Sequence, residues 1–225
     1  TYRGQEGAKA DYAPAGLRFS EQGAHFTGLE RGVAQGAVRL PLGGAHNVEN
    51  ALGVIAAARG LGLAHAEIAA GLASFAGVKR RQEVRGEKRG VLVIDDFAHH
   101  PTAVRETIQA VKGRCPGRRV WAIFEPRSNT SRRNLHQEEY ARSFVGADRA
   151  SIKVADPHDK IPAGEGLDVP RLAAALATGG IPAFAAPSVD ALLDEVISGA
   201  REGDVLLVMS NGSFGGFVEK LLARL

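Results

Sequence analysis

From residue 91 to the end of the chain, short apolar runs alternate with segments in which apolar residues recur every three or four positions. Such runs are typical of buried strands, and the second spacing is typical of helices with one buried face. The expected strands are 91–95, 119–124, 149–154, 181–185 and 204–209. The expected helices begin near Thr102, Leu135, Val169, Ser188 and Phe214. The alternation predicts an α/β fold with a mostly parallel sheet and helices on both faces.

The first part of the chain has a different pattern. It is rich in glycine, and its short alternating runs predict antiparallel strands joined by glycine turns, at 17–19, 24–26 and 33–42. A helix is expected over 47–60. A second helix is expected to end near Gly77 and to carry on one face Ile68, Leu72 and Phe75.

The rhythm changes at a basic segment, 77–81, which we interpret as a linker. We therefore divide the chain into two domains, 1–79 and 80–225. The chain begins with Thr1 rather than Met, and we expect it to be a fragment or a processed chain.

Composition argues against several classes of partner. The net charge is +3, and basic residues occur in short clusters without interleaved aromatic residues, so no nucleic-acid partner is expected. No apolar stretch approaches the roughly 18 residues of a membrane span and no signal peptide is present, so no membrane partner is expected. The single cysteine, Cys115, precludes an internal disulfide and fits a reducing cytoplasm.

Polar residues follow three of the predicted strands directly. Asp95 and Asp96 follow the first, the loop 125–133 follows the second, and the turn 210–216 follows the last. Ligands of parallel sheets bind beyond the carboxyl ends of the strands. We therefore place the candidate site at this edge of the sheet.

The first of these segments offers a carboxylate and two histidines. Asp96 is the strongest single candidate, because a carboxylate just past a strand can accept hydrogen bonds from both hydroxyls of a ribose. His99 and His100 are alternative metal ligands together with the aspartates. Adjacent histidines in one loop rarely point the same way, and no third cluster completes a site, so we favour no metal site.

The other two segments suit an anionic ligand. The loop 125–133 combines guanidinium and hydroxyl donors, which suit a substrate that carries carboxylates. The turn 210–216 offers backbone N–H groups to an anion. The alternatives are a polar surface loop and a plain strand-to-helix turn. The turn is not a nucleophile elbow, and no Ser-His-Asp order supports a hydrolase.

Two motifs nearer the beginning could contact a nucleotide. Asn47 and Asn50 share one face of a helical turn, and their carboxamides suit the edge of an adenine. On these residues alone we favour the alternative, in which Asn47 is a helix N-cap and Asn50 faces solvent. Arg81 could reach a phosphate when two domains close, and the alternative is a solvated linker.

Taken in order, these motifs resemble those of the Mur ligase family, from about residue 40 to the C-terminus. The asparagines stand where that family has residues that contact the nucleotide base. Arg81 stands where the family has an arginine near the γ-phosphate, and Asp96 stands where it has an aspartate that binds the ribose. The ATP-binding residues that the resemblance implies are His46, Asn47, Asn50, Arg81 and Asp96.

Two segments, 124–133 and 209–216, resemble one branch of the family. They read Phe-Glu-Pro-Arg-Ser-Asn-Thr-Ser-Arg-Arg and Met-Ser-Asn-Gly-Ser-Phe-Gly-Gly. That branch joins UDP-N-acetylmuramate to the murein tripeptide L-alanyl-γ-D-glutamyl-meso-diaminopimelate. The branch that adds L-alanine resembles Gln-Pro-His-Arg in the first segment. The implied substrate-binding residues are His99, Arg127, Ser128, Asn129, Thr130, Arg132, Arg133, Ser210, Asn211 and Gly212.

The resemblance also implies a fold and a reaction. Residues 80–225 would form a Rossmann-like C-terminal domain, and residues 1–79 the last part of a central ATPase domain. The implied reaction is ATP-dependent amide-bond formation through an acyl phosphate, with magnesium, during peptidoglycan recycling in the bacterial cytoplasm.

Part of the family's machinery is absent from this sequence. It contains no Gly-x-x-x-x-Gly-Lys-(Ser/Thr) phosphate loop. The resemblance places the family's magnesium-binding glutamate and modified lysine upstream of the motifs found here. We therefore assign no catalytic residue within this chain and expect the chain alone to be inactive.

Three alternatives remain open. The first is an L-alanine-adding ligase, against which stand Arg127 and Ser128. The second is a stand-alone module that binds a nucleotide or a peptide without catalysis. The third is a nucleic-acid-binding protein, which rests only on the basic charge balance. The sequence does not indicate the oligomeric state.

Overall fold

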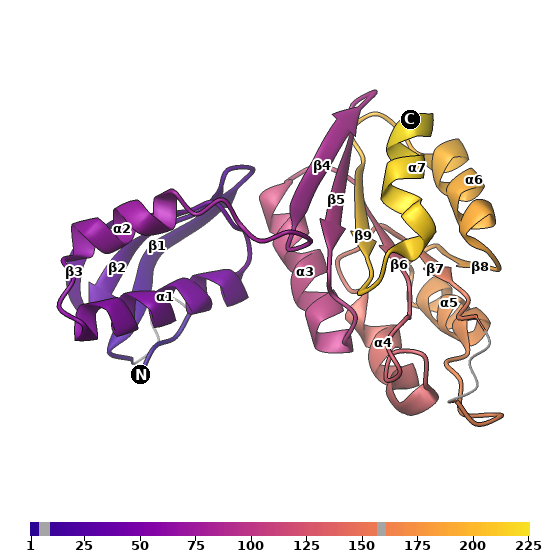
Figure 1. Ribbon diagram of the computed structural model, residues 1–225, viewed down its shortest axis with the longest axis horizontal. Helices are drawn as coiled ribbons and strands as arrows, with labels where there is room; N and C mark the ends of the chain where they lie inside the picture. Colours follow the sequence, from indigo (N-terminus) through magenta and orange to yellow (C-terminus); the bar gives the residue numbers. More distant parts are fainter. Residues whose placement is uncertain (5–9, 157–160) are drawn as a thin grey trace. The chain divides into compact units, whose positions relative to one another are not determined.

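The chain forms two compact units in a computed structural model that describes residues 1–4, 10–156 and 161–225 (Figure 1). The N-terminal unit comprises Thr1–Val78 and Gly113–Pro116, and the C-terminal unit comprises Lys79–Lys112 and Gly117–Leu225. The division falls within the expected linker. In the described parts of both units, no helix is long and apolar enough to cross a membrane.

The N-terminal unit is a three-stranded antiparallel sheet packed against two helices. Its strands lie in the order β1 (Tyr12–Ser20), β2 (Gly23–Glu30) and β3 (Val33–Leu40). The helices are α1 (Ala45–Gly60) and α2 (His65–Ala73). Alternate strand residues such as Phe26 and Val38 pack against Val48, Leu52 and Ile68 of the helices, so one sheet face and one face of each helix form the core.

One expectation for this unit is wrong. The second helix ends at Ala73, and Phe75, which was expected on its buried face, is 41% exposed. Ser74 caps the helix through its backbone N–H, and the chain then leaves the helical path. In the sequence, apolar residues remain three or four positions apart beyond Ala73, so this spacing overestimated the length of the helix.

The C-terminal unit contains a six-stranded sheet in the order β4-β5-β9-β6-β7-β8. Its strands are β4 (Glu83–Lys88), β5 (Val91–Asp96), β6 (Val120–Phe124), β7 (Arg149–Lys153), β8 (Ala183–Ala186) and β9 (Val205–Met209). The pairs among β5 to β9 are parallel, which confirms the expected α/β architecture. The antiparallel edge strand β4 was not expected, because its sequence is charged and its one large apolar residue, Val84, is 46% exposed.

Helices cover both faces of this sheet. They are α3 (Pro101–Arg114), α4 (Gln137–Ser143), α5 (Val169–Thr178), α6 (Val189–Gly199) and α7 (Phe217–Arg224), with 3₁₀ turns η1 (Asn134–His136) and η2 (Phe214–Gly216). On one face, α6 and α7 pack on Trp121, Ile123 and Val208 (Figure 1). On the other face, Tyr140 of α4 packs against Phe124.

The last helix begins later than expected. Phe214, Gly215 and Gly216 all have positive φ, at 48°, 59° and 71°, so the chain turns through η2 before α7 starts at Phe217. Glycine adopts this left-handed backbone without strain, which explains why two glycines stand in the turn.

Candidate functional site

The three polar segments lie side by side, because they follow neighbouring strands. In the parallel ladders Asp96 pairs with Met209, and Met209 pairs with Phe124. The backbone N–H of Ser210 donates to the carbonyl of Asp96 at 3.0 Å, and that of Glu125 donates to the carbonyl of Met209 at 3.0 Å. The chain thus brings together at one edge the groups that the strand pattern placed at three separate strand ends.

Asp96 is enclosed by its own chain. The residue is 2% exposed, its Oδ2 accepts the N–H of Gln82 at 2.8 Å, and its Oδ1 accepts the N–H of Ala98 at 2.7 Å. The hydroxyl of Thr107 adds a longer bond of 3.4 Å. Burial raises the pKa of Asp96 above 3.8, although the two N–H groups favour its charged form. In this arrangement a ribose could reach the carboxylate only after one of these donors moved away.

The linker is bound to the loop that follows β5. The guanidinium groups of Arg80 and Arg81 lie 5.4 and 5.3 Å from the ring centre of Phe97. The N–H of Phe97 donates to the carbonyl of Arg80 at 2.7 Å, and Arg80 Nη2 donates to the carbonyl of Ser210. Arg81 is exposed and could meet a phosphate, which stays a prediction.

The asparagine motif opens α1 of the N-terminal unit. Gly44 is the N-cap, so the alternative in which Asn47 caps this helix is wrong. Asn47 lies in the first turn and its Nδ2 donates to the carbonyl of Gly43 at 2.7 Å. Asn50 is exposed and His46 is half-buried. A contact between these side chains and a base stays a prediction.

The loop after β6 directs Arg127 across Gly212. A Cβ placed on Gly212 would lie 1.9 Å from Cδ and 2.1 Å from Nε of Arg127, so only glycine permits this approach. The Arg127 side chain is 44% exposed, and its Nη1 lies 3.9 Å from Oε1 of Glu125. The second and third polar segments therefore touch, and an exposed cation lies at their contact.

The rest of this loop forms a turn that is held by hydrogen bonds between its own residues. Ser128 Oγ donates to Ser131 Oγ at 2.8 Å and accepts the N–H of Ser131 at 3.0 Å. Asn129 and Thr130 are exposed at the tip. Arg133 forms an ion pair with Glu165 from the loop after β7. The exposed tip and Arg127 are thus the parts of this loop most open to a ligand.

Comparison with known proteins identifies the family of the chain. The family model of the Mur ligase, glutamate ligase domain, matches residues 80–212. The chain belongs to the Mur ligase family.

The chain is similar to several Mur ligases. It is 43% identical, over 83% of its own length and 39% of the relative's, to the UDP-N-acetylmuramate--L-alanyl-gamma-D-glutamyl-meso-2,6-diaminoheptandioate ligase of Escherichia coli. It is 39% identical, over 84% of itself and 41% of the relative, to the UDP-N-acetylmuramate--L-alanine ligase of Desulfatibacillum aliphaticivorans. It matches the crystal structure of a murein peptide ligase from Psychrobacter arcticus with a TM-score of 0.64 and 32% identity, over 96% of itself and 44% of that chain. The chain therefore spans less than half the length of these relatives.

In this Mur ligase chain, the two histidines considered as metal ligands, His99 and His100, make contacts of another kind. His99 Nδ1 lies 3.0 Å from the carbonyl of Phe97, and its own carbonyl accepts the hydroxyl of Tyr140. The ring centres of His100 and His136 lie 4.9 Å apart. In the described ranges no group of three His, Cys, Asp or Glu side chains is placed to hold a metal ion.

Two buried residues at the site were not among the sequence candidates. Glu125 is 9% exposed and accepts the hydroxyl of Ser210, and Ser131 is 1% exposed inside its turn. Glu125 directly follows an apolar run in the sequence, as the two aspartates do, and the same signal could have identified it. Nothing in the sequence distinguishes Ser131 from its exposed neighbours.

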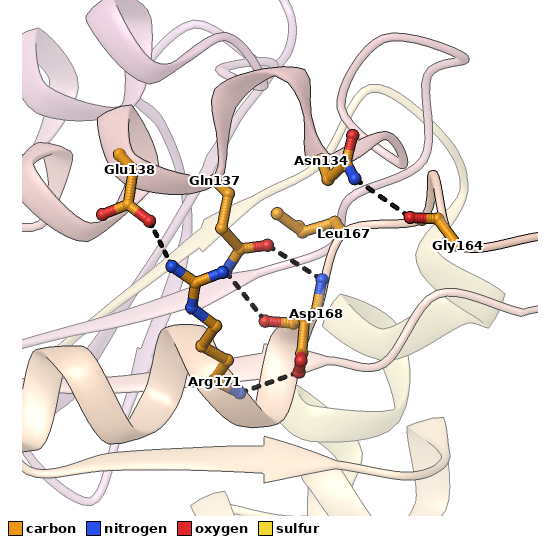
Figure 2. A pocket seen from close by; sticks show the side chains of 8 residues that line it. Asn134, Gln137, Glu138, Gly164, Leu167, Asp168 and Arg171 are labelled. Carbon is orange, nitrogen blue, oxygen red and sulfur yellow. Dashed lines mark hydrogen bonds and ion pairs between the residues drawn. The ribbon is translucent and has the colours of Figure 1, made fainter.

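A pocket of about 630 Å³ lies beyond the loop 125–133, between α4 and the start of α5. Figure 2 shows that the polar groups which line it bind one another. Gln137 donates to the carbonyl of Asp168 at 3.0 Å and accepts its N–H at 2.9 Å, while Glu138 pairs with Arg171 at 2.6 Å. These bonds join the two elements, and we assign the pocket no ligand.

Proposed function

We propose that this chain is part of an ATP-dependent ligase that joins UDP-N-acetylmuramate to L-alanyl-γ-D-glutamyl-meso-diaminopimelate. The observation that carries the proposal is the exposed guanidinium of Arg127, which lies across Gly212 beside the strand ends. The relative from Escherichia coli, whose name states this reaction, gives further support.

The proposed peptide substrate suits the charge of this edge. The tripeptide carries carboxylates at its second and third residues, and guanidinium groups bind carboxylates through paired hydrogen bonds. Arg127 offers such a group, with the exposed side chains of Asn129 and Thr130 close by in sequence. We propose that this loop holds the peptide so that its α-amino group meets the activated muramate carboxyl.

ATP supplies the phosphoryl group that activates the carboxylate in this proposal. The exposed Arg81 fits a role as a phosphate-binding residue. The enclosed Asp96 fits a ribose-binding role only if a donor such as the Gln82 N–H moves away from it. The described residues contain no cluster suited to magnesium, and we propose no magnesium ligand in this chain. The setting that we propose is the bacterial cytoplasm.

A second candidate is an L-alanine-adding ligase. The 39% identity to the ligase from Desulfatibacillum aliphaticivorans favours it. L-alanine has one carboxylate and no further acidic groups, so it would leave much of the loop's donor set unused. We therefore favour the tripeptide ligase over this second candidate.

The test measures ADP release by the full-length ligase that would contain this chain, with ATP and UDP-N-acetylmuramate. The tripeptide and L-alanine are offered in turn. Turnover with the tripeptide alone supports the proposal, and turnover with L-alanine alone replaces it with the second candidate. The 225-residue chain on its own is expected to release no ADP with either amine, because it lacks the phosphate loop.

A further inference from the structure

Glu125 joins two polar segments of the candidate site. It directly follows β6, and its N–H donates to the carbonyl of Met209 on the neighbouring strand β9 at 3.0 Å. Its side chain is only 12% exposed. The paired strands therefore fix the point from which this carboxylate projects.

The inner oxygen of this carboxylate orders the turn after β9. Oε2 of Glu125 accepts the hydroxyl of Ser210, which is itself 1% exposed. The same hydroxyl oxygen accepts the N–H of Gly212 at 2.9 Å. A hydroxyl has one proton, so its donation to Glu125 leaves the oxygen lone pairs for Gly212. Glu125 thereby sets the direction of this hydroxyl and the start of the turn.

The outer oxygen of the carboxylate faces Arg127. Oε1 lies 3.9 Å from Nη1, which is an ion pair beyond hydrogen-bonding distance. Among the described residues, no side chain or carbonyl accepts a hydrogen bond from this guanidinium. The aliphatic part of the Arg127 side chain crosses Gly212. Glu125 also influences the position of Gly212, because it binds the Ser210 hydroxyl that accepts the Gly212 N–H. Two separate contacts thus run from Glu125 to Arg127, one through charge and one through packing.

We infer that Glu125 is a positioning residue, which holds the guanidinium of Arg127 where it meets a carboxylate of the peptide. The identity of the ligand rests on the proposed function, whereas the contact between Glu125 and Arg127 does not. A guanidinium can bind carboxylates along more than one edge, so Glu125 and a peptide carboxylate need not compete. Ordering Arg127 before binding reduces the conformational entropy that binding would otherwise cost.

The first arm of the test needs no ligand. Glu125→Gln keeps the size of the side chain and an acceptor for Ser210, but it removes the charge that faces Arg127. The NMR signal of Arg127 Nε–H, assigned by its loss in Arg127→Ala, is expected to move toward the position of a free arginine. The control, Glu165→Gln, removes the charge that faces Arg133 and should leave the signal in place. An Arg127 signal that does not respond to Glu125→Gln overturns the inference.

The second arm measures binding of the tripeptide to the chain in a double-mutant cycle. Glu125→Gln is expected to weaken binding about fivefold when Arg127 is present and less than about twofold in Arg127→Ala. Equal losses in both backgrounds would show a merely structural role and overturn the inference. If Glu125→Gln does not fold, Ser210→Ala replaces it and is expected to show the same dependence on Arg127.

The two arms separate this inference from the proposed function. If the Arg127 signal responds to Glu125→Gln but the parent chain does not bind the tripeptide, the assigned ligand is wrong and the positioning contact stands. If the chain binds the tripeptide but the signal does not respond, the proposed ligand stands and the role of Glu125 is wrong.

Discussion

Two strand ends of the C-terminal unit carry an acid in the same sequence context, and their surroundings differ. Asp96 ends β5 and Glu125 follows β6, and both are buried. The oxygens of Asp96 accept two backbone N–H groups, one from Ala98 in its own loop and one from Gln82 just before β4. Glu125 accepts the hydroxyl of Ser210 and faces the exposed Arg127. An acid after an apolar strand is therefore not by itself a ligand contact, because its partners decide what it does.

This difference predicts that substitutions at one strand end lower folding stability and that substitutions at the other weaken peptide binding. Changes at the β5 end should destabilise the C-terminal unit, since they leave buried N–H groups without acceptors. Replacing Arg127, which Glu125 faces after β6, should weaken peptide binding with little effect on stability, since the Arg127 side chain is 44% exposed.

The largest expected effect is that of Asp96→Ala on stability. The change removes the acceptor of the Gln82 and Ala98 N–H groups, and we expect the free energy of unfolding to fall by about 3 kcal/mol. Fluorescence of Trp121, the only tryptophan in the chain, reports urea unfolding of this unit. The control, Asp194→Ala, removes an exposed ion pair with Arg224 and should cost less than about 1 kcal/mol. Equal losses of unfolding free energy in the two variants would show that the enclosed Asp96 contributes no more to stability than an exposed acid.

The next effect is that of Arg127→Ala on peptide binding. In the full-length ligase we expect the KM for the tripeptide to rise at least about tenfold, because the peptide loses a guanidinium contact. The free energy of unfolding should change by less than about 0.5 kcal/mol, as for other exposed positions. Arg224→Ala, which removes an exposed arginine on α7, is the matched control. An unchanged KM would remove Arg127 from the site.

A smaller effect is expected from Gly212→Ala. The new methyl group would overlap Cδ of Arg127, at 1.9 Å, and displace that side chain. We expect the KM for the tripeptide to rise about threefold in the parent and to stay unchanged in Arg127→Ala, since coupled residues are not additive. Gly113→Ala, where a Cβ meets nothing within 4 Å, is the control. A rise of KM in both backgrounds would mean that Gly212 acts independently of Arg127.

The smallest effect concerns pH. Burial raises the pKa of Asp96 in the folded state above its ordinary value of 3.8. The folded state then binds this proton more tightly than the unfolded state, so the contribution of Asp96 to stability is complete below 3.8 and declines as the pH rises through the folded pKa. The free energy of unfolding of Asp96→Asn relative to the parent should therefore increase from pH 3 toward neutral pH. A difference that is constant over this range would show that burial does not perturb Asp96.

Much of the fold followed from the sequence. Apolar runs marked the five parallel strands, and the spacing of Val104, Ile108 and Val111 marked a helix whose inner residues are fully buried. The pattern failed where local residues were ambiguous. The charged strand β4 pairs through its backbone, and Phe75 kept the helical spacing after the helix had ended.

The candidate site could be predicted only in part. The motifs indicated which loops carry polar groups, and the family resemblance proposed roles for them. Neither indicated that Glu125 joins Ser210 to Arg127, because that link depends on β9 lying between β5 and β6.

The sequence by itself determined the order of strands and helices and the polar loops that follow the strands, since hydrophobic spacing and turn residues act locally. The tertiary structure decided which strand ends are neighbours and which carboxylate is enclosed. Both depend on pairing between segments far apart in the chain, such as Asp96 with Met209 and Met209 with Phe124. As a result, Asp96 and Glu125, which both end apolar runs, have different partners.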